Sequence, residues 1–540
     1  MNYYPDSERD EWAYRYKRFG YTQFVLLEAI VSARRSEKVI GRLGEHRRSG
    51  KFDVDAIDKP PEIIEVRRVP PPIPETATEK MTDDQWLKAI ARYNEEGLRQ
   101  LPTGQTVARA RSLAGLLIKP AQTEPSRFAN LLLKFPDKTH WLYFNAILQG
   151  VSSVGLEPGT LLKVYKRCHN LPDRPCGRSI ADLIAKKPSQ PNFPKELFEI
   201  LAWYATEDPD PEPGHPNITI KDKDSDEPES ILINGINSVR GRASKAIATL
   251  IFSDPERCSY FLPILQRLVK DPSVAVKACV AETLVAVLNY DRDVAVELFV
   301  TLCKDEETLL GTRYVERFLF YATSTHFEPL KPILVKMLQS HITGVATAGT
   351  RQICLASLDQ EEAIPIAQSY LSGEAQQIGA AEVFATNLRD SQFRAYCEES
   401  LIKLFDSPYE TVQTAASHCF DRFKGDELGE YTELVEAFVN SKAFATNRYG
   451  FFRVCENTTA RLPEVTILIC EKFLEQTDID AGDIRTRATI DSSTISKLVI
   501  RVYSQNQEDE NIQSRCLDVI DRMAQIRAYG LSQALSLYER

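Results

Sequence analysis

The apolar positions of the sequence repeat with a spacing that suits pairs of short helices, most clearly between residues 231 and 460. An alignment of the expected helix starts gives a register column whose neighbours are 33 to 37 residues apart. Its members are Val239, Val276, Leu310, Val345, Ile378, Val412 and Thr446. Eight positions further on, a second column is apolar in all but one member, as the buried face of a helix requires. Its members are Ile247, Leu284, Phe318, Ile353, Thr386, Phe420 and Val454.

Turn residues separate the two helices expected in each repeat, for example Asp271-Pro272-Ser273 and Asp406-Ser407-Pro408. Asp and Ser side chains there accept hydrogen bonds from the unpaired N–H groups that begin the next helix. Three repeats also carry a proline in the first helix, which predicts that this helix bends or starts late. These prolines are Pro263, Pro332 and Pro365. The pattern therefore predicts repeats of helix, tight turn and helix.

These residues resemble the HEAT-like helical repeats, whose second helix often begins with Asp, then Val, then Arg or Lys, with Ala and Leu at helical spacing. The best match is formed by Asp271, Val276, Lys277, Ala281 and Leu284. The resemblance covers roughly residues 231–460, and less clearly the remainder to 540. It implies an all-α fold, an α-solenoid of helix-turn-helix repeats, in which the second helices line the concave face of a right-handed superhelix.

Two proline-rich segments divide the rest of the chain. Proline excludes regular helix and favours extended linkers, and residues 207–229 also carry 9 Asp/Glu against 2 Lys, which predicts a solvated, flexible loop. The expected parts are a basic helical segment (1–51), a proline-rich linker (52–81), a helical domain (82–205), an acidic disordered loop (206–230) and the repeat solenoid (231–540).

Charge and cysteine usage limit the classes of partner and compartment. The net charge is −10, although residues 1–51 carry 11 Lys/Arg against 7 Asp/Glu. A track for a nucleic-acid backbone normally needs a surplus of basic residues, so the balance disfavours nucleic acid without excluding a local patch. No run reaches membrane-spanning length and no secretory signal is recognisable, and the 11 Cys show no regular pairing. We therefore expect a cytoplasmic protein that does not bind membranes.

Three further segments resemble parts of the helical C-terminal regions of large bacterial NTPases of the STAND or NACHT type. The segments are Met81–Leu87, Ala202–Asp208 and Gly235–Gly241. Such regions are thought to sense a target, and the sequence contains no NTPase domain. The resemblance implies a detached sensor region that works in bacterial antiviral defence, with an NTPase or effector encoded separately.

No catalytic motif is recognisable, and we expect no enzyme activity and no cofactor. Cys168, His169 and Cys176 offer two or three zinc ligands without a convincing fourth, so buried cysteines between two helices are the favoured interpretation. Asp478, Asp480 and Asp483 suggest a calcium loop, but Thr489 stands where a bidentate Glu is needed.

A column six positions after the register column defines the expected partner-binding strip. It contains Lys245, Glu282, Glu316, Arg351, Phe384, His418 and Phe452, with Arg240 and Arg242 at its start. A charged ridge is usually only a solvated face, but two aromatic residues within it are typical of a protein-binding surface. The first hypothesis is therefore a non-catalytic scaffold or sensor that binds a protein, with Phe384 and Phe452 as exposed anchors.

Two other functions remain open from the sequence. A nucleic-acid-binding HEAT-like protein or DNA-repair enzyme would use the basic cluster of Arg240, Arg242 and Lys245, and would need a continuous positive groove. A cofactor lyase or assembly factor would need a large apolar pocket beside a reactive cysteine.

Overall fold

The structure, a computed structural model, describes residues 27, 30–31, 34–48, 71–78, 80–100, 106–108, 110–154, 156–186, 194–212, 228–423, 425–458, 461–476 and 487–538. Several of the expected features, among them most of the basic N-terminal segment (1–51), fall wholly or partly outside the described residues. The acidic residues Asp478, Asp480 and Asp483 lie outside the described residues, as do positions 52–70 of the expected linker and 213–227 of the expected acidic loop.

The chain divides into two compact units. Unit 1 comprises Met1–Pro71 and Leu98–Ala108, and unit 2 comprises Pro72–Gly97 and Arg109–Arg540. The described regular elements of unit 1 are helix α3 (Glu37–Arg48) and strands β1 (Leu98–Gln100) and β2 (Thr106–Ala108). The strands pair antiparallel with Arg99 opposite Val107, and this short hairpin is an addition to a fold that is otherwise helical in its described parts.

Unit 2 begins with a series of short helices. These are α4 (Glu75–Thr78), α5 (Asp83–Arg92), α6 (Ala110–Gly115), α7 (Ile118–Thr123), α8 (Pro125–Leu133), α9 (Trp141–Val154), α10 (Pro158–His169), α11 (Gly177–Lys186), α12 (Lys195–Thr206) and α13 (Pro228–Asn237). The side chain of Thr82 accepts a hydrogen bond from the backbone of Gln85, whose side chain in turn accepts from Thr82, so a capping box begins α5.

The remaining helices of unit 2 alternate between two sets, which we call A and B helices. The A helices are α15 (Cys258–Leu268), α17 (Arg292–Leu302), α19 (Phe327–Leu338), α21 (Ala363–Tyr370), α23 (Arg394–Phe405), α25 (Thr432–Val439), α28 (Pro463–Gln476) and α30 (Glu510–Gln525). The B helices are α14 (Val239–Ser253), α16 (Val274–Val287), α18 (Arg313–Ala322), α20 (Thr343–Asp359), α22 (Glu374–Asn387), α24 (Glu410–Ser417), α26 (Lys442–Asn447), α27 (Tyr449–Asn457), α29 (Arg487–Gln505) and α31 (Leu531–Tyr538). Short 3-10 segments are η4 (Pro255–Arg257), η5 (Thr308–Gly311), η6 (His418–Arg422) and η7 (Gly425–Glu430).

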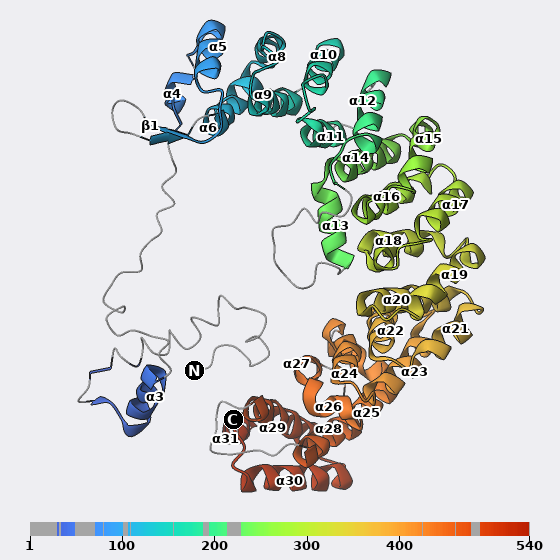
Figure 1. The fold of residues 1–540 in the computed structure, drawn as a ribbon. Coiled ribbons are helices and arrows are strands. Elements are labelled where there is room, and N and C mark those ends of the chain that lie inside the picture. Colours follow the sequence, from blue (N-terminus) through green and yellow to red (C-terminus); the bar gives the residue numbers. More distant parts are fainter. Residues whose placement is uncertain are drawn as a thin grey trace. The chain divides into compact units, whose positions relative to one another are not determined.

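Each B helix packs against the next B helix, and A helices pack against neighbouring A helices. Contacts join α14 to α16, α16 to α18, α20 to α22 and α22 to α24 in the B row, and α17 to α19 and α23 to α25 in the A row. Figure 1 shows the two rows running side by side through unit 2. The chain is therefore an all-α solenoid of HEAT-like helix-turn-helix repeats, which confirms the predicted fold class.

The helical stack continues on both sides of the acidic segment. α11 contacts α14 and α12 contacts α15, although residues 206–230 separate them in sequence. The start of that segment is ordered, because Asp208 is buried and its backbone oxygen accepts a hydrogen bond from Arg240 Nη1 at 2.8 Å. Its end is also ordered, since α13 begins at Pro228.

The core follows the expected apolar column. Ile247, Leu284, Phe318, Ile353 and Phe420 are each 0% exposed. Aliphatic and aromatic side chains at this register fill the space between the two rows, and burying each one stabilises the array by roughly 1.5–3 kcal/mol.

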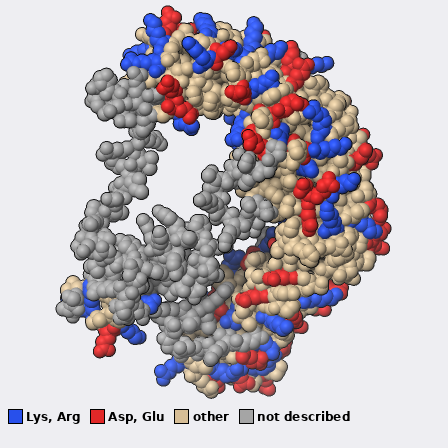
Figure 2. All heavy atoms as spheres, in the orientation of Figure 1, with Lys and Arg blue, Asp and Glu red and all other residues tan. Residues whose placement is uncertain are grey.

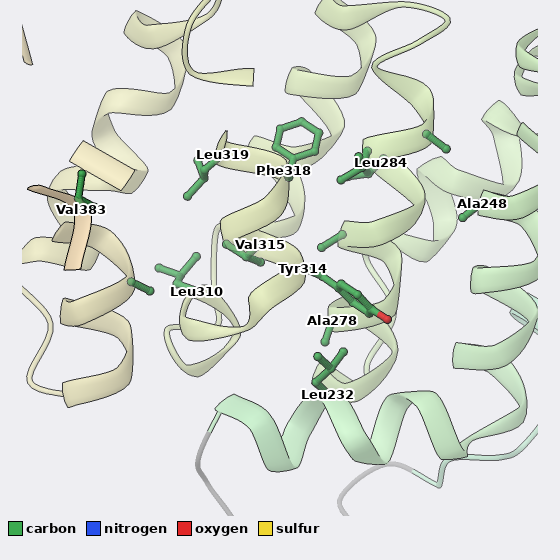
Figure 3. Close-up of a cluster of buried hydrophobic side chains, with 14 of the residues drawn as sticks. Leu232, Ala248, Ala278, Leu284, Leu310, Tyr314, Val315, Phe318, Leu319 and Val383 are labelled. Atoms are coloured by element: carbon green, nitrogen blue, oxygen red, sulfur yellow. The ribbon is translucent and has the colours of Figure 1, made fainter. Parts of the chain in front are cut away.

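Helix α13 departs from the alternation of A and B helices. It packs against α14, α16 and η5, and Figure 3 shows Leu232 pointing from it toward Ala278 and Tyr314. Gly235 is required there, because a Cβ at this position would lie 2.0 Å from the backbone oxygen of Ala275. α13 is thus fixed closely across several consecutive repeats.

Among the described residues, no helix combines the length and the apolar character needed to cross a lipid bilayer.

Candidate partner-binding face

The middle of the B row carries a chain of ion pairs between consecutive repeats. Arg317 on α18 pairs with Glu282 on α16 at 2.9 Å. Arg351 on α20 donates from Nε and Nη2 to both carboxylate oxygens of Glu316, at 2.8 and 2.9 Å. Its Nη1 also donates to Glu382 on α22 at 2.8 Å. We call this set the ion-pair ladder, and it joins four successive B helices.

The ladder raises the pKa of its central residue, Arg351. Burial would lower the pKa of Arg351, but the hydrogen bonds and charges of Glu316 and Glu382 outweigh burial and hold this pKa above its ordinary value. Glu282, Glu316 and Arg351 were expected to face a partner. The structure instead uses their charges in ion pairs that join repeats, and all three residues are half-buried.

The basic cluster expected at the start of the strip is largely neutralised. Arg240 is buried and pairs with Asp271, with Nε to Oδ2 at 3.1 Å. Arg242 pairs with Asp182 at 2.5 Å. The expectation that Arg240 is available to a partner is therefore wrong, because its charge closes a contact inside the solenoid.

Lys245, the third residue of that cluster, is half-buried. Its Nζ lies 5.4 Å from the centroid of the Tyr314 ring, a distance typical of a cation–π contact. On the face shown in Figure 2, basic and acidic residues are interspersed along unit 2. This distribution differs from the continuous positive groove that a nucleic-acid backbone needs.

The two expected aromatic anchors are buried, and this prediction is wrong. Phe384 is 1% exposed and Phe452 is 3% exposed. The sequence alignment placed Phe384 two residues out of register. Helix α20 begins two residues before its register residue Val345, whereas α22 begins four residues before Ile378. The exposed column position in this repeat belongs to Glu382, the Arg351 partner.

The error at Phe452 has a different cause. The B segment of its repeat is broken into α26 and α27 at Arg448, so the helical phase restarts and Phe452 turns into the core. There its ring lies 6.0 Å from Phe444 and 6.1 Å from Phe473, measured between ring centroids.

The break at Arg448 also creates a pocket of about 240 Å³ between two consecutive repeats. One wall comes from α24 and η6, and the other from the junction of α26 and α27. The lining residues are Thr414, Ser417, His418, Asp421, Asn447, Tyr449 and Gly450. The first four are spaced i, i+3, i+4 and i+7, so they share one helical face. His418 is exposed, and it is the one residue of the expected strip that lines this pocket.

The hydroxyl hydrogens of Thr414 and Ser417 are directed to oxygens of the protein. The Thr414 hydroxyl lies 2.8 Å from Asn447 Oδ1 and 2.9 Å from the backbone oxygen of Glu410, two alternative acceptors for one hydrogen. Ser417 Oγ donates to the backbone oxygen of Gln413 at 2.7 Å. The hydroxyl oxygens therefore remain as acceptors toward the pocket.

Ser417, His418 and Asp421 are the three residue types of a hydrolase triad, but they are not arranged as one. A triad needs hydrogen bonds from nucleophile to base and from base to carboxylate. In the described part of the chain, no hydrogen bond joins Ser417 to His418 or His418 to Asp421, and Ser417 donates to backbone instead.

The Cys168, His169 and Cys176 cluster lies in a buried aromatic site between α10 and α12. Both cysteines are buried, and the His169 ring lies 5.4 Å from Trp203 and 5.2 Å from Tyr204 between centroids. Desolvation, followed by the charge of Arg174, lowers the pKa of His169 to about 4. Within the described ranges no group of three or more His, Cys, Asp or Glu residues is placed to hold a metal ion.

Sequence reasoning missed most of the pocket and a set of exposed aromatic residues. Exposed rings lie at or just after the C-terminal ends of three successive B helices: Phe252, Tyr290, Phe320 and Tyr321. Tyr449 at the pocket is 62% exposed. The clustering of Asn447 and Gly450, two residues that disfavour helix interiors, was the available signal for the break at Arg448.

Comparisons with known proteins add a distant likeness. A scan against protein-family models and a search of curated proteins each give no match. Among solved structures, one of importin beta matches with 9% identity and a TM-score of 0.31, covering 96% of this chain and 71% of that chain. A chain from the structure of the Pds5–Scc1 complex matches with 12% identity and a TM-score of 0.22, covering 82% of this chain and 68% of that chain. Both likenesses are too distant to transfer a binding property, and the repeat fold stands on the arrangement of the helices themselves.

Proposed function

We propose that the chain is a non-catalytic scaffold that binds a protein partner through its B row, which the HEAT-like resemblance places on the concave face. The observation that carries the proposal is the pocket between α24 and α27. It is open, lined by polar side chains of two consecutive repeats, and lies in the same B row as the ion-pair ladder. A fixed row of this kind suits a partner that lies across several repeats.

The paired charges favour protein over nucleic acid as the partner. Arg240 and Arg242 are committed to Asp271 and Asp182, so the basic cluster leaves little positive charge for phosphates. A lyase that uses a reactive cysteine is also disfavoured. Each of the 11 cysteines is buried, and burial raises the pKa of thiols such as Cys354, to about 12.

A finer proposal concerns the biological setting. The resemblance of Met81–Leu87, Ala202–Asp208 and Gly235–Gly241 to sensor regions of STAND or NACHT NTPases supports a sensor that acts in the bacterial cytoplasm during antiviral defence. In that case, the partner is a viral protein or a separately encoded effector. Deletion of the gene should lower survival after phage infection, and unchanged survival against a broad phage panel would reject this setting.

The test of the scaffold proposal is capture of a partner that depends on the B row. The full chain is used as bait in lysate of the source organism, beside the pocket variants His418→Ala and Tyr449→Ala. The matched control is Lys403→Ala on α23, because Lys403 is a 68% exposed side chain on the A row.

A protein captured by the wild type and the control but lost from both pocket variants supports the proposal. Hydrogen exchange of the complex should then show protection in the B helices α22, α24, α26 and α27, and none in the A helices α21, α23 and α25. Capture that is equal for all baits, or protection confined to A helices, would overturn it.

A further inference from the structure

We propose that the pocket between α24 and α27 receives a basic side chain of the partner, preferentially that of an arginine, with Asp421 as its counter-charge. The proposal deepens the scaffold function and rests on it. It follows from three features of the pocket: its charge, its hydrogen-bonding capacity and its size.

The charge of the pocket comes from Asp421. Asp421 is the acidic residue among the lining residues, and neither Lys nor Arg is among them. The described structure contains no hydrogen bond or ion pair to the carboxylate oxygens of Asp421. The neighbouring cation, Arg453, is directed instead to the backbone oxygen of Asp421, at 3.4 Å from Nη2. The carboxylate is thus open to an external cation.

The position of this carboxylate depends on Gly450. A Cβ at Gly450 would lie 2.1 Å from Asp421 Oδ1, so only glycine allows the carboxylate to rest against the first turn of α27. The positive end of the helix dipole lies there, and it stabilises a negative charge in the first turn. The carboxylate is therefore held at the wall of the pocket rather than extended into solvent.

The hydrogen-bonding capacity of the pocket calls for a ligand that donates. Ser417 Oγ and Thr414 Oγ1 have their hydrogens committed to oxygens of the protein, and the carboxylate of Asp421 can only accept. A guanidinium carries five N–H donors and no acceptor, and it matches a carboxylate with two parallel hydrogen bonds. A lysine ammonium supplies three donors without the planar fit.

The size of the pocket restricts what enters it. A volume of about 240 Å³ is below the range of pockets for drug-sized ligands, which begins at about 300 Å³. It suits one long side chain, whose aliphatic stem would lie near the exposed ring of Tyr449. The remainder of the partner would then lie along the B row.

The test uses His418 as a reporter in the full chain. The chain has 7 His, so protein labelled with ¹³C at histidine gives a small set of ring signals, and the His418→Gln variant identifies the signal of His418. The probes are acetyl-arginine amide, acetyl-lysine amide and the uncharged isostere acetyl-citrulline amide. Acetyl-glutamate amide controls for charge sign and ionic strength.

Acetyl-arginine amide should shift the His418 signal saturably, with a Kd on the order of 1 mM, and should bind more tightly than acetyl-lysine amide. Asp421→Asn and Gly450→Ala should each weaken this binding about tenfold or more, the first by removing the charge and the second by displacing the carboxylate. The matched control Glu399→Gln removes a 68% exposed carboxylate on α23 and should leave the binding unchanged.

An equal shift with acetyl-citrulline amide, a stronger shift with acetyl-glutamate amide, or no saturable shift with acetyl-arginine amide would overturn the proposal. If captured partners still depend on His418 and Tyr449 in that case, only the basic ligand is rejected and the scaffold function stands. If the arginine probe binds as expected but no protein is captured through the B row, the scaffold function is rejected instead.

Discussion

Arg240 and Asp271 form a buried ion pair that joins the first turn of α14 to the turn before α16. Their side chains are 7% and 6% exposed, and two hydrogen bonds connect them, from Nε to Oδ2 at 3.1 Å and from Nη2 to Oδ1 at 3.3 Å. Arg240 also donates to the backbone oxygen of Asp208. One side chain therefore holds together the end of the α12 region and two repeats.

Replacing Arg240 by Ala should destabilise the protein by about 3–5 kcal/mol, because the carboxylate of Asp271 would stay buried without its counter-charge. The matched control is Arg267→Ala, which removes an exposed arginine paired with Glu207 and should cost about 0–1 kcal/mol. Chemical denaturation measures both losses. Equal losses in the two variants would contradict the role assigned to Arg240.

Phe384→Ala and Phe452→Ala should each cost about 3–5 kcal/mol of stability, since each removes a buried ring and leaves a cavity. Phe320→Ala serves as the control, because this ring is 55% exposed and its loss should change stability by no more than about 0.5 kcal/mol. Thermal melts compare the three variants. If Phe384→Ala melted at the wild-type temperature, the burial of this ring in the core would be contradicted.

The ion-pair ladder should stabilise the solenoid more than an isolated surface pair does. Arg351→Ala breaks three charge-assisted hydrogen bonds at a side chain that is 31% exposed, and should cost about 1.5–3 kcal/mol. Lys403→Ala, which breaks one exposed pair within α23, should cost about 0.3–0.5 kcal/mol. Urea titrations at low and high salt test the difference. If the ion-pair ladder did not stabilise the fold, Arg351→Ala and Lys403→Ala would show the same small loss of stability.

Acid should destabilise the site around His169. Burial, assisted by Arg174, lowers the pKa of His169 from 6.5 to about 4, so the unfolded chain takes up a proton at a pH where the folded chain does not. The contribution of this histidine is fully present above about pH 6.5 and is lost as the pH falls through about 4. The melting temperature of wild type should therefore drop more steeply over this window than that of His169→Gln. Parallel pH profiles would contradict the lowered pKa.

The repeat fold was predictable because it depends on a local and redundant signal. Apolar residues such as Ile247, Leu284 and Ile353 recur at the same position in six of the seven aligned repeats, so an error at one of them does not hide the pattern. Face assignment within a repeat is more sensitive. A two-residue error rotates an α-helix by more than half a turn, which is why Phe384 was placed on the surface when it lies in the core.

The pocket could not be predicted from the sequence, for a different reason. His418 was placed on the B row, but Asn447 and Gly450, which line the same pocket, come from the next repeat, where the helix breaks at Arg448. Pairings between repeats also decide which charges are free. Nothing in the pattern distinguishes Arg240, which closes a buried ion pair, from an arginine that faces solvent, because Asp271 belongs to the following repeat.

Helix α13 limits how this array evolves and how it unfolds. It contacts α14, α16 and η5, and at its start Pro228 reaches Gly344 at the beginning of α20. In an array linked only through nearest neighbours, a repeat is gained or lost without disturbing the others, and unfolding proceeds one repeat at a time. A helix that contacts several repeats, as α13 does, fixes the number of these repeats and makes them unfold together. We therefore expect duplication or loss of repeats to be tolerated better beyond α20 than between α14 and α20.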